Sequence, residues 1–221
     1  MIKLRFLLLF FVLVSTKVLS QTTPLPTPIT GFEAQELPFE IVPIPYLPKN
    51  PFRKTVLGKF ILVSNGNENE NYGSNLYYKR NRDSSWVAIY LDYNQIKMDT
   101  VNLDRRGEAE LIIDCKGCTY TKDAGNCAGL YMIINTDDVP TAVLNIRNYC
   151  FTEGNMHTPQ YYADHLIRPI TIRNRIINIP AISKTENDKW AKNNGCSLTY
   201  VAGGMYRFVG GRVKKIAGAK K

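Results

Sequence analysis

Positively charged side chains gather at two places in the chain, each beside a run of β-forming residues. The first group is Lys79, Arg80 and Arg82, and the second is Arg173 and Arg175. Side chains two positions apart on a strand project from the same face, and guanidinium groups bind sulfate or phosphate through two parallel hydrogen bonds. We therefore predict that these five residues bind an anionic partner. The alternative is that the cations only protect an edge strand from pairing with another chain.

The two histidines, His157 and His165, offer a second kind of chemistry. Two imidazoles can serve as general base and general acid in a nuclease or hydrolase. Their spacing of eight residues fits neither i+2 on a strand nor i+4 on a helix, so nothing in the sequence brings the rings together. No Gly-x-Ser-x-Gly, His-Glu-x-x-His or glycine-rich phosphate loop occurs. We expect no catalytic residues, and a hydrolase or nuclease that uses the histidines is the alternative.

A polar loop at Asn65–Asn75 carries amide and carboxylate oxygens, which suit calcium or a sugar. Calcium loops usually place carboxylates at odd positions around a central glycine. Here Glu68 and Glu70 alternate with asparagines, and there is no Asp-x-Asp-x-Asp core. A solvated hairpin tip is the simpler interpretation, because these residues tolerate left-handed backbone. The sequence therefore predicts neither a metal nor a cofactor.

Five cysteines lie in the second half of the chain. Cys115-x2-Cys118 resembles half of a zinc site, but no fourth ligand follows at a suitable spacing. We expect disulfides instead, with Cys118–Cys127 closing a small loop and Cys115–Cys150 joining neighbouring strands. Cys196 is then the odd thiol, open to pairing between chains in a disulfide-linked dimer. Spacing alone does not determine this connectivity.

The first 20 residues have the form of a signal peptide. A cationic start precedes the apolar run Phe6–Val14, and small residues end at Ser20, before the expected cleavage site. The run of about nine residues is shorter than the ~20 that a membrane-spanning helix needs. We therefore expect no transmembrane segment, a secreted and extracellular protein, and oxidising surroundings for the cysteines.

The rest of the chain divides by composition. Residues 21–52 hold eight of the 12 prolines and predict an extended arm. The more apolar second part of this arm is expected to lie along a sheet edge. Residues 53–211 are expected to form a single β domain, and residues 212–221 a basic C-terminal tail.

Short runs of β-branched and aromatic residues recur along residues 53–211. About ten such runs predict an all-β fold, an antiparallel β-sandwich of jelly-roll-like form, with a closed β-barrel as the alternative. The strand pattern alone is similar to that of lectin-like and CUB-like modules, and this likeness implies no site residues. We expect hairpins at Trp86–Leu103 and around Gly203-Gly204. Brief helices are expected at Gln160–Leu166 and Lys184–Lys192.

Charge adds a modest indication of function. The formal net charge of +9 falls to about +6 without the leader, which carries three cations and no acids. Such a charge permits attraction to anionic glycans, phosphates or lipid headgroups. We predict a secreted, non-enzymatic recognition protein that binds a carbohydrate, polyanion or protein partner outside the cell. A membrane-active effector is a further alternative, and nucleic acid is not expected as a partner.

Overall fold

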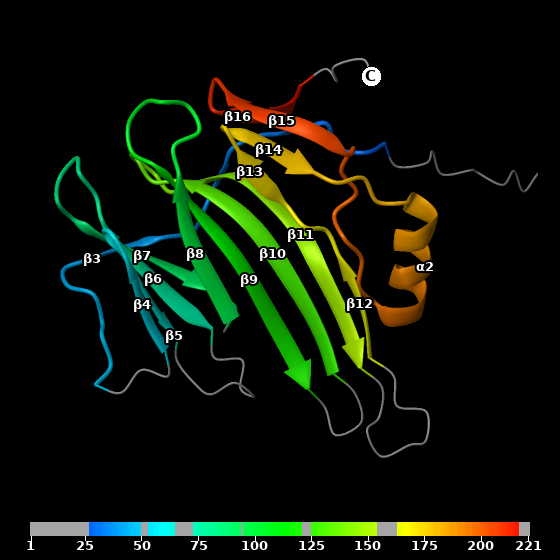
Figure 1. The fold of residues 1–221 in the computed structure, drawn as a ribbon. Helices are drawn as coiled ribbons and strands as arrows, with labels where there is room; N and C mark the ends of the chain where they lie inside the picture. The colour runs from blue at the N-terminus through cyan, green and yellow to red at the C-terminus, as the bar shows by residue number, and fades with distance from the viewer. Residues whose placement is uncertain are drawn as a thin grey trace, which may run out of the picture.

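Three antiparallel sheets make up most of the molecule in the computed structural model, which describes residues 27–49, 53–64, 73–93, 95–120, 125–153 and 163–216. Within these ranges there are sixteen strands and one short helix (Figure 1). The predicted antiparallel, mostly-β class is therefore confirmed, although the expected number of strands was too low. The alternative of a closed barrel is wrong, because none of the three sheets closes on itself.

The longest strands form one sheet, here called the central sheet. Its order is β12-β11-β10-β9-β8, and β2 pairs with the start of β11. The strands are β2 (Gln35–Glu36), β8 (Gln95–Val101), β9 (Glu110–Tyr120), β10 (Gly125–Asn135), β11 (Thr141–Glu153) and β12 (Ala163–Ile167).

Each of the other two sheets has five strands. The N-terminal sheet has the order β3 (Glu40–Val42), β7 (Trp86–Leu91), β6 (Ser74–Lys79), β5 (Phe60–Ser64) and β4 (Arg53–Leu57). The C-terminal sheet has the order β1 (Gly31–Phe32), β16 (Arg212–Lys215), β15 (Gly204–Val209), β14 (Ile176–Ile179) and β13 (Thr171–Arg173).

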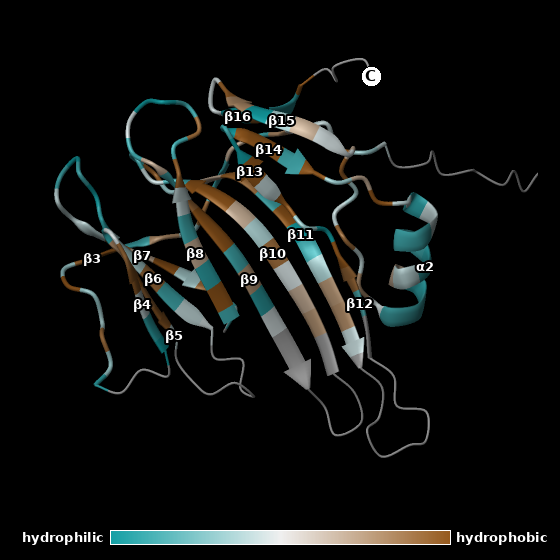
Figure 2. Ribbon diagram, in the orientation of Figure 1, coloured by the Kyte–Doolittle hydropathy of each residue, from teal (hydrophilic) through white to brown (hydrophobic). Residues whose placement is uncertain are grey.

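The middle of the central sheet, around β9 and β10, is buried on both faces. Alternate side chains of a strand point to opposite faces, so Met132 and Ile134 contact the N-terminal sheet while Tyr131 and Ile133 contact the C-terminal sheet. The first interface contains Phe60, Leu62, Leu76, Tyr78, Val87, Ile89, Leu91, Ile96, Leu111, Ile113, Cys115, Met132 and Ile134. The second contains Leu103, Tyr131, Ile133, Val143, Leu144, Ile146, Ile177, Ile179, Val201, Tyr206, Phe208 and Val213. Hydrophobic residues accordingly recur along β9 and β10 (Figure 2).

The segment that precedes β4 joins all three sheets. Its strands β1, β2 and β3 pair with β16, β11 and β7 respectively, and β1 and β3 form sheet edges. The Ile29 N–H also donates to the Tyr200 carbonyl at 3.0 Å. Part of the proline-rich arm thus lies along sheet edges. The basic tail expected from residue 212 is wrong at its start, because β16 is paired on both sides and Val213 is fully buried.

Two hairpin predictions are wrong. Strands β7 and β8 belong to different sheets, because the short connection between them crosses from the N-terminal to the central sheet. Gly203 is not in a turn: a Cβ there would lie 2.5 Å from Ala181, so glycine is needed for close packing. The β15–β16 turn instead uses Gly210 and Gly211, whose φ values are 58° and 78°.

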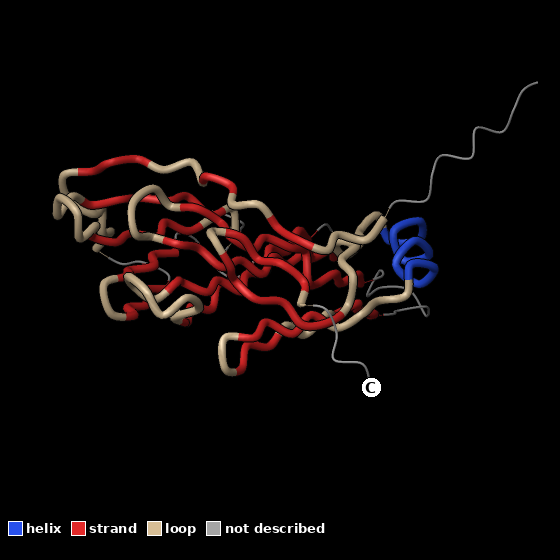
Figure 3. The backbone as a smooth tube through the Cα atoms, turned by 90° about the horizontal axis from the view of Figure 1, so that it is seen from above, coloured by secondary structure: helices blue, strands red, loops and turns tan. Residues whose placement is uncertain are grey.

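The helix expected at Lys184–Lys192 is confirmed as α2 (Lys184–Asn194). Ser183 accepts a hydrogen bond from the Glu186 N–H at 3.3 Å, and Gly195 ends the helix with a φ of 66°. Helix α2 lies at one end of the molecule (Figure 3), where Trp190 packs with Leu166 and Leu198. The other expected helix is wrong from residue 163 onward, where β12 pairs with β11, and residues 160–162 lie outside the described ranges.

The disulfide pattern differs from the prediction. Cys150 is bonded to Cys196, with Cα atoms 6.1 Å apart, so Cys196 is not the odd thiol. The predicted Cys115–Cys150 bridge is wrong because β10 separates their strands, which puts them about 10 Å apart, beyond disulfide reach. Cys115 is free and buried, and burial raises the pKa of its thiol to about 12.

The predicted Cys118–Cys127 bridge stays a prediction. Cys127 is disulfide-bonded, and its Cα lies opposite that of Cys118 in the β9–β10 ladder. The side chain of Cys118 lies outside the described part of the chain.

The Cys150–Cys196 bridge closes a loop of 46 residues that includes α2. We expect the variant C196S to lose about 2–4 kcal/mol of unfolding free energy in urea titrations. In the native wild-type protein without reductant, mass spectrometry after alkylation should find both Cys115 and Cys196 unmodified. Modification of Cys196 under those conditions would contradict the assigned pairing.

Candidate functional site

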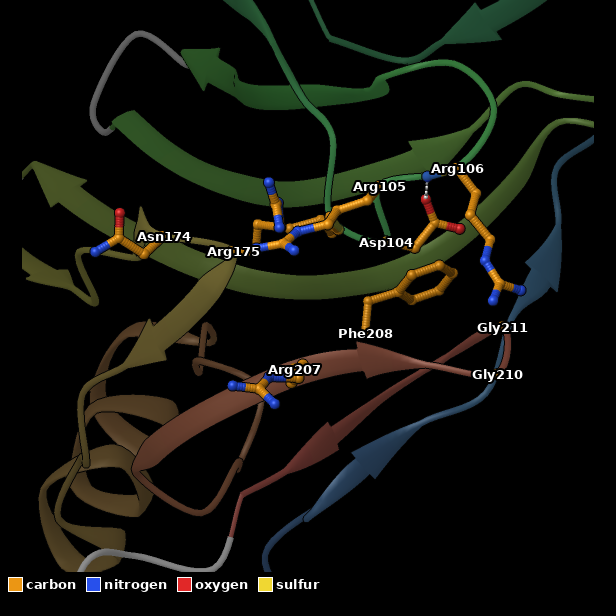
Figure 4. A pocket seen from close by; sticks show the side chains of 10 residues that line it. Asp104, Arg105, Arg106, Asn174, Arg175, Arg207, Phe208, Gly210 and Gly211 are labelled. Carbon is orange, nitrogen blue, oxygen red and sulfur yellow. Dashed lines mark hydrogen bonds between the residues drawn. The ribbon is translucent and has the colours of Figure 1, made fainter.

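A pocket of about 620 Å³ lies between the hairpin turns of the C-terminal sheet and the β8–β9 loop, residues 102–109 (Figure 4). The β13–β14 and β15–β16 turns meet there because both lie at the same end of the sheet. Four arginines and one aspartate give the lining a formal charge of +3. The lining residues are Leu103, Asp104, Arg105, Arg106, Asn174, Arg175, Arg207, Phe208, Gly210 and Gly211.

Short-range hydrogen bonds shape the β8–β9 loop. Asn102 Oδ1 accepts from the Arg105 N–H at 2.6 Å, and Asp104 Oδ1 accepts from the Arg106 N–H at 2.7 Å. Such side-chain acceptors stabilise tight turns, and Arg105 adopts a φ of 66°. A non-glycine residue in this region carries conformational strain. The loop therefore presents Arg105 and Arg106 on a backbone that local contacts hold in place.

Glu110 anchors the loop from beneath. Its Oε2 atom accepts from the Leu103 N–H at 2.8 Å, and the residue is only 1% exposed. Burial raises the pKa of this carboxyl, because the charged form loses its hydration, while the hydrogen bond from Leu103 acts in the opposite direction. A buried acceptor at the first residue of β9 thus fixes the position of the loop.

Contacts with the other layers hold the far side of the loop. Glu108 forms an ion pair with Lys59, and its N–H donates to Asp137 Oδ1 at 3.2 Å. A Cβ at Gly107, where φ is 60°, would lie 2.8 Å from the Asp137 carboxylate. The loop is therefore tied to the N-terminal sheet as well as to the central sheet.

The two hairpin turns at the pocket have the same backbone conformation but are made of different residues. Each has two residues at positive φ, as type I′ turns require. Gly210 and Gly211 adopt 58° and 78° without steric cost, whereas Asn174 and Arg175 adopt 50° and 62°. Asparagine tolerates this region, but glycine is the preferred second residue. Arg175 thus brings a guanidinium group to the pocket at the expense of backbone strain.

The guanidinium groups at the pocket have no anionic partner within the described ranges. None of Arg105, Arg106, Arg175 and Arg207 takes part in the ion pairs found among those residues. In Figure 4 the side chains of Arg105 and Arg175 extend toward the same part of the pocket, and Arg106 lies across Phe208 from them. Arg207 and Phe208 leave β15 on opposite sides. Phe208 is buried and gives the pocket an apolar wall.

The five cations chosen from the sequence do not come together. Arg175 lines the pocket, while Arg173 lies on β13, beside a separate cavity. Lys79 ends β6 of the N-terminal sheet. Arg80 pairs with Asp83 at 2.6 Å, and Arg82 pairs with Asp138 at 2.7 Å. Arg80 thus stabilises the β6–β7 turn, and Arg82 links that turn to the β10–β11 turn of the central sheet.

Sequence reasoning missed Arg105, Arg106 and Arg207. A signal existed for the first two, because they precede Gly107 in a turn between two apolar runs. Arg207 offered only an alternating position beside buried aromatic residues. What joins the three to Arg175 is the meeting of a loop from one sheet with two turns of another.

Neither histidine lies at the pocket within the described ranges. His165 is an exposed residue of β12, where its Cα faces that of Phe151. His157 lies outside those ranges, as does most of the Asn65–Asn75 loop. Where the chain is described, no three or more His, Cys, Asp or Glu residues gather as metal ligands. The described helix is too short and too polar to cross a membrane.

Comparisons with known proteins add no relationship: no protein-family model, curated protein or solved structure matches this chain. The function of the pocket has to be inferred from its own geometry.

The strain at Arg175 predicts an unusual stability effect. We expect R175G to keep or raise the unfolding free energy, by up to about 1 kcal/mol, because glycine adopts positive φ without the Cβ clash. N174G should gain less, since asparagine already tolerates this region. Urea titrations test both variants. A clear loss of stability in R175G would mean that the guanidinium group supports the fold.

The buried carboxyl of Glu110 predicts a pH dependence. Its folded-state pKa lies above that of the unfolded chain, so the folded protein holds this proton more tightly. The unfolding free energy should therefore fall as the pH rises from the ordinary glutamate range through the raised pKa. E110Q cannot ionise but keeps an acceptor for Leu103, so it should flatten this fall in urea titrations between about pH 4 and pH 8.

E110A distinguishes charge from hydrogen bonding at the same position. It leaves the buried Leu103 N–H without its acceptor and should lose about 1–3 kcal/mol at every pH. Equal pH profiles for the wild type and E110Q would contradict the raised pKa.

Proposed function

We propose that the protein is a non-enzymatic recognition protein that binds a sulfate- or phosphate-bearing glycan in the arginine-lined pocket. The observation that carries this proposal is that Arg105, Arg106, Arg175 and Arg207 line one pocket with no carboxylate paired to them among the described residues. Asp104, the acid in the lining, accepts a hydrogen bond from the backbone N–H of Arg106. Guanidinium groups suit sulfate and phosphate because both offer oxygens for two parallel hydrogen bonds.

Physical cost supports a bound anion. Four like charges at one pocket repel one another, and two of the arginines occupy strained backbone. Such strain is typical of ligand sites that hold their binding groups in position before the ligand arrives. A bound anion with two or more negative charges would attract all four arginines and so offset their mutual repulsion.

The other lining residues suit a sugar. Leu103 and Phe208 supply an apolar wall against which the face of a sugar ring can pack. The volume of about 620 Å³ lies within the range of pockets for small organic ligands. Asp104 and Asn174 add a carboxylate and an amide that can accept or donate hydrogen bonds to sugar hydroxyl groups.

The extracellular setting is part of the proposal. The signal peptide expected at residues 1–20 and the Cys150–Cys196 disulfide both fit an exported chain. The finer jelly-roll-like arrangement stays a prediction, and the proposal does not depend on it. The alternatives of a histidine-dependent hydrolase and a membrane-active effector also stay predictions.

Calorimetric titration with a heparin-derived trisulfated disaccharide tests the proposal, with the unsulfated disaccharide as the ligand control. We expect R175Q and R207Q each to lower the affinity about tenfold, the loss of roughly one charged hydrogen-bonded contact. R173Q is the matched control, because Arg173 belongs to the same hairpin but does not line the pocket.

Two results would contradict this function. Equal affinity for the sulfated and unsulfated disaccharides would show that the arginines do not bind the sulfate groups. Equal losses in R173Q and R175Q would show that net charge matters and the pocket does not.

A further inference from the structure

The strands of the C-terminal sheet carry five cations and no acidic residue. Buried residues of these strands, such as Tyr206 and Val213, face the central sheet. The cations that alternate with them on the strands are therefore on the outer face. The outer-face cations are Arg173, Arg207, Arg212 and Lys214. Lys215 lies opposite Tyr206 and therefore belongs to the other face.

Strand register aligns three of these cations in a row across the outer face. Arg207 lies directly opposite Lys214 in the β15–β16 ladder. One step beyond the Ile177–Tyr206 pair, Ile176 comes beside Arg207, and Ile176 is opposite Arg173. At about 4.8 Å per strand, the row from Lys214 to Arg173 spans about 14 Å. We call Lys214, Arg207 and Arg173 the cation row.

Edge protection does not explain the cation row. Arg173 is on the edge strand β13, but β15 and β16 are interior strands with partners on both sides. Like charges directly opposite each other destabilise a sheet, and the Arg207–Lys214 pair has no acidic neighbour in the strands of this sheet. Arg207 also lines the arginine pocket, so the row and the pocket form one continuous cationic surface.

We infer that the ligand is a linear sulfated polysaccharide, whose chain runs from the arginine pocket along the cation row. This inference rests on the proposed function and specifies its ligand class. Single-stranded nucleic acid is less suitable, because it is usually bound through exposed aromatic side chains on which bases stack. None of the described neighbours of the cation row on the outer face is aromatic: they are Thr171, Ile176, Asn178, Met205, Val209 and Arg212.

The test compares a heparin-derived disaccharide with an octasaccharide of the same sulfation pattern. The variant K214Q/R173Q leaves the pocket lining intact. It should bind the disaccharide as the wild type does but bind the octasaccharide about tenfold more weakly. The slope of log affinity against log salt for the octasaccharide should decrease by about one for each cation removed. K189Q/K192Q, which changes two exposed lysines of α2, is the charge-matched control.

Stability provides an independent readout. Removal of one member of a like-charged cross-strand pair should raise the melting temperature of K214Q by about 1–3 °C. A lower melting temperature in K214Q would overturn the argument that the pair is retained for a ligand.

The binding outcomes separate the two proposals. An octasaccharide affinity no higher than that of the disaccharide would overturn the cation row and leave the pocket standing. A single-stranded polynucleotide of equal charge that binds as tightly, with the same loss in K214Q/R173Q, would overturn the polysaccharide. Failure of both sulfated sugars to bind would overturn the proposed function itself.

Discussion

Burial of strands β9 and β10 on both faces of the central sheet is the constraint on which the rest of the structure depends. Strands β9 and β10 alternate side chains such as Ile133 and Ile134 between two cores, so neither face can be left to water without a large loss of hydrophobic stabilisation. Two further sheets are needed to cover them. Strands β1, β2 and β3 of one short segment then add a strand to each sheet, which joins the three layers by backbone hydrogen bonds as well as by packing.

The position of the pocket follows from this layering. The β8–β9 loop leaves the central sheet at the end where the C-terminal sheet makes its two hairpin turns, so cations from separate layers meet. Rigidity is required there, because repelling guanidinium groups would otherwise move apart. Glu110 supplies it from the buried start of β9, and the Lys59–Glu108 ion pair supplies it from the N-terminal sheet. The central and N-terminal sheets therefore each contribute a residue that fixes the position of the loop.

Local patterns predicted what depends on neighbours in sequence. Period-2 alternation indicated antiparallel β structure, and Ser183, Glu186 and Gly195 mark the ends of α2 as capping rules require. Features that depend on layer assignment could not be predicted in this way. Cys115 and Cys150 both lie on strands of the central sheet, but pairing them requires knowing that β10 separates those strands. Arg175 was expected to share a strand face with Arg173, but it lies in the β13–β14 turn. Arg105 and Arg207 become its neighbours only when two sheets meet.

The strongest indications of function are the positions where the chain carries a residue that lowers the stability of the fold although a more stabilising residue would fit. The β15–β16 turn uses Gly-Gly for positive φ, and the neighbouring β13–β14 turn uses Asn174 and Arg175 for the same geometry. In the interior of the C-terminal sheet, Arg207 lies directly opposite Lys214, so two positive charges face each other across the β15–β16 ladder. Glycine at one position and an acid at another would remove both costs without altering the core. Because both departures lie on one continuous cationic surface, a single anionic ligand that spans it accounts for both.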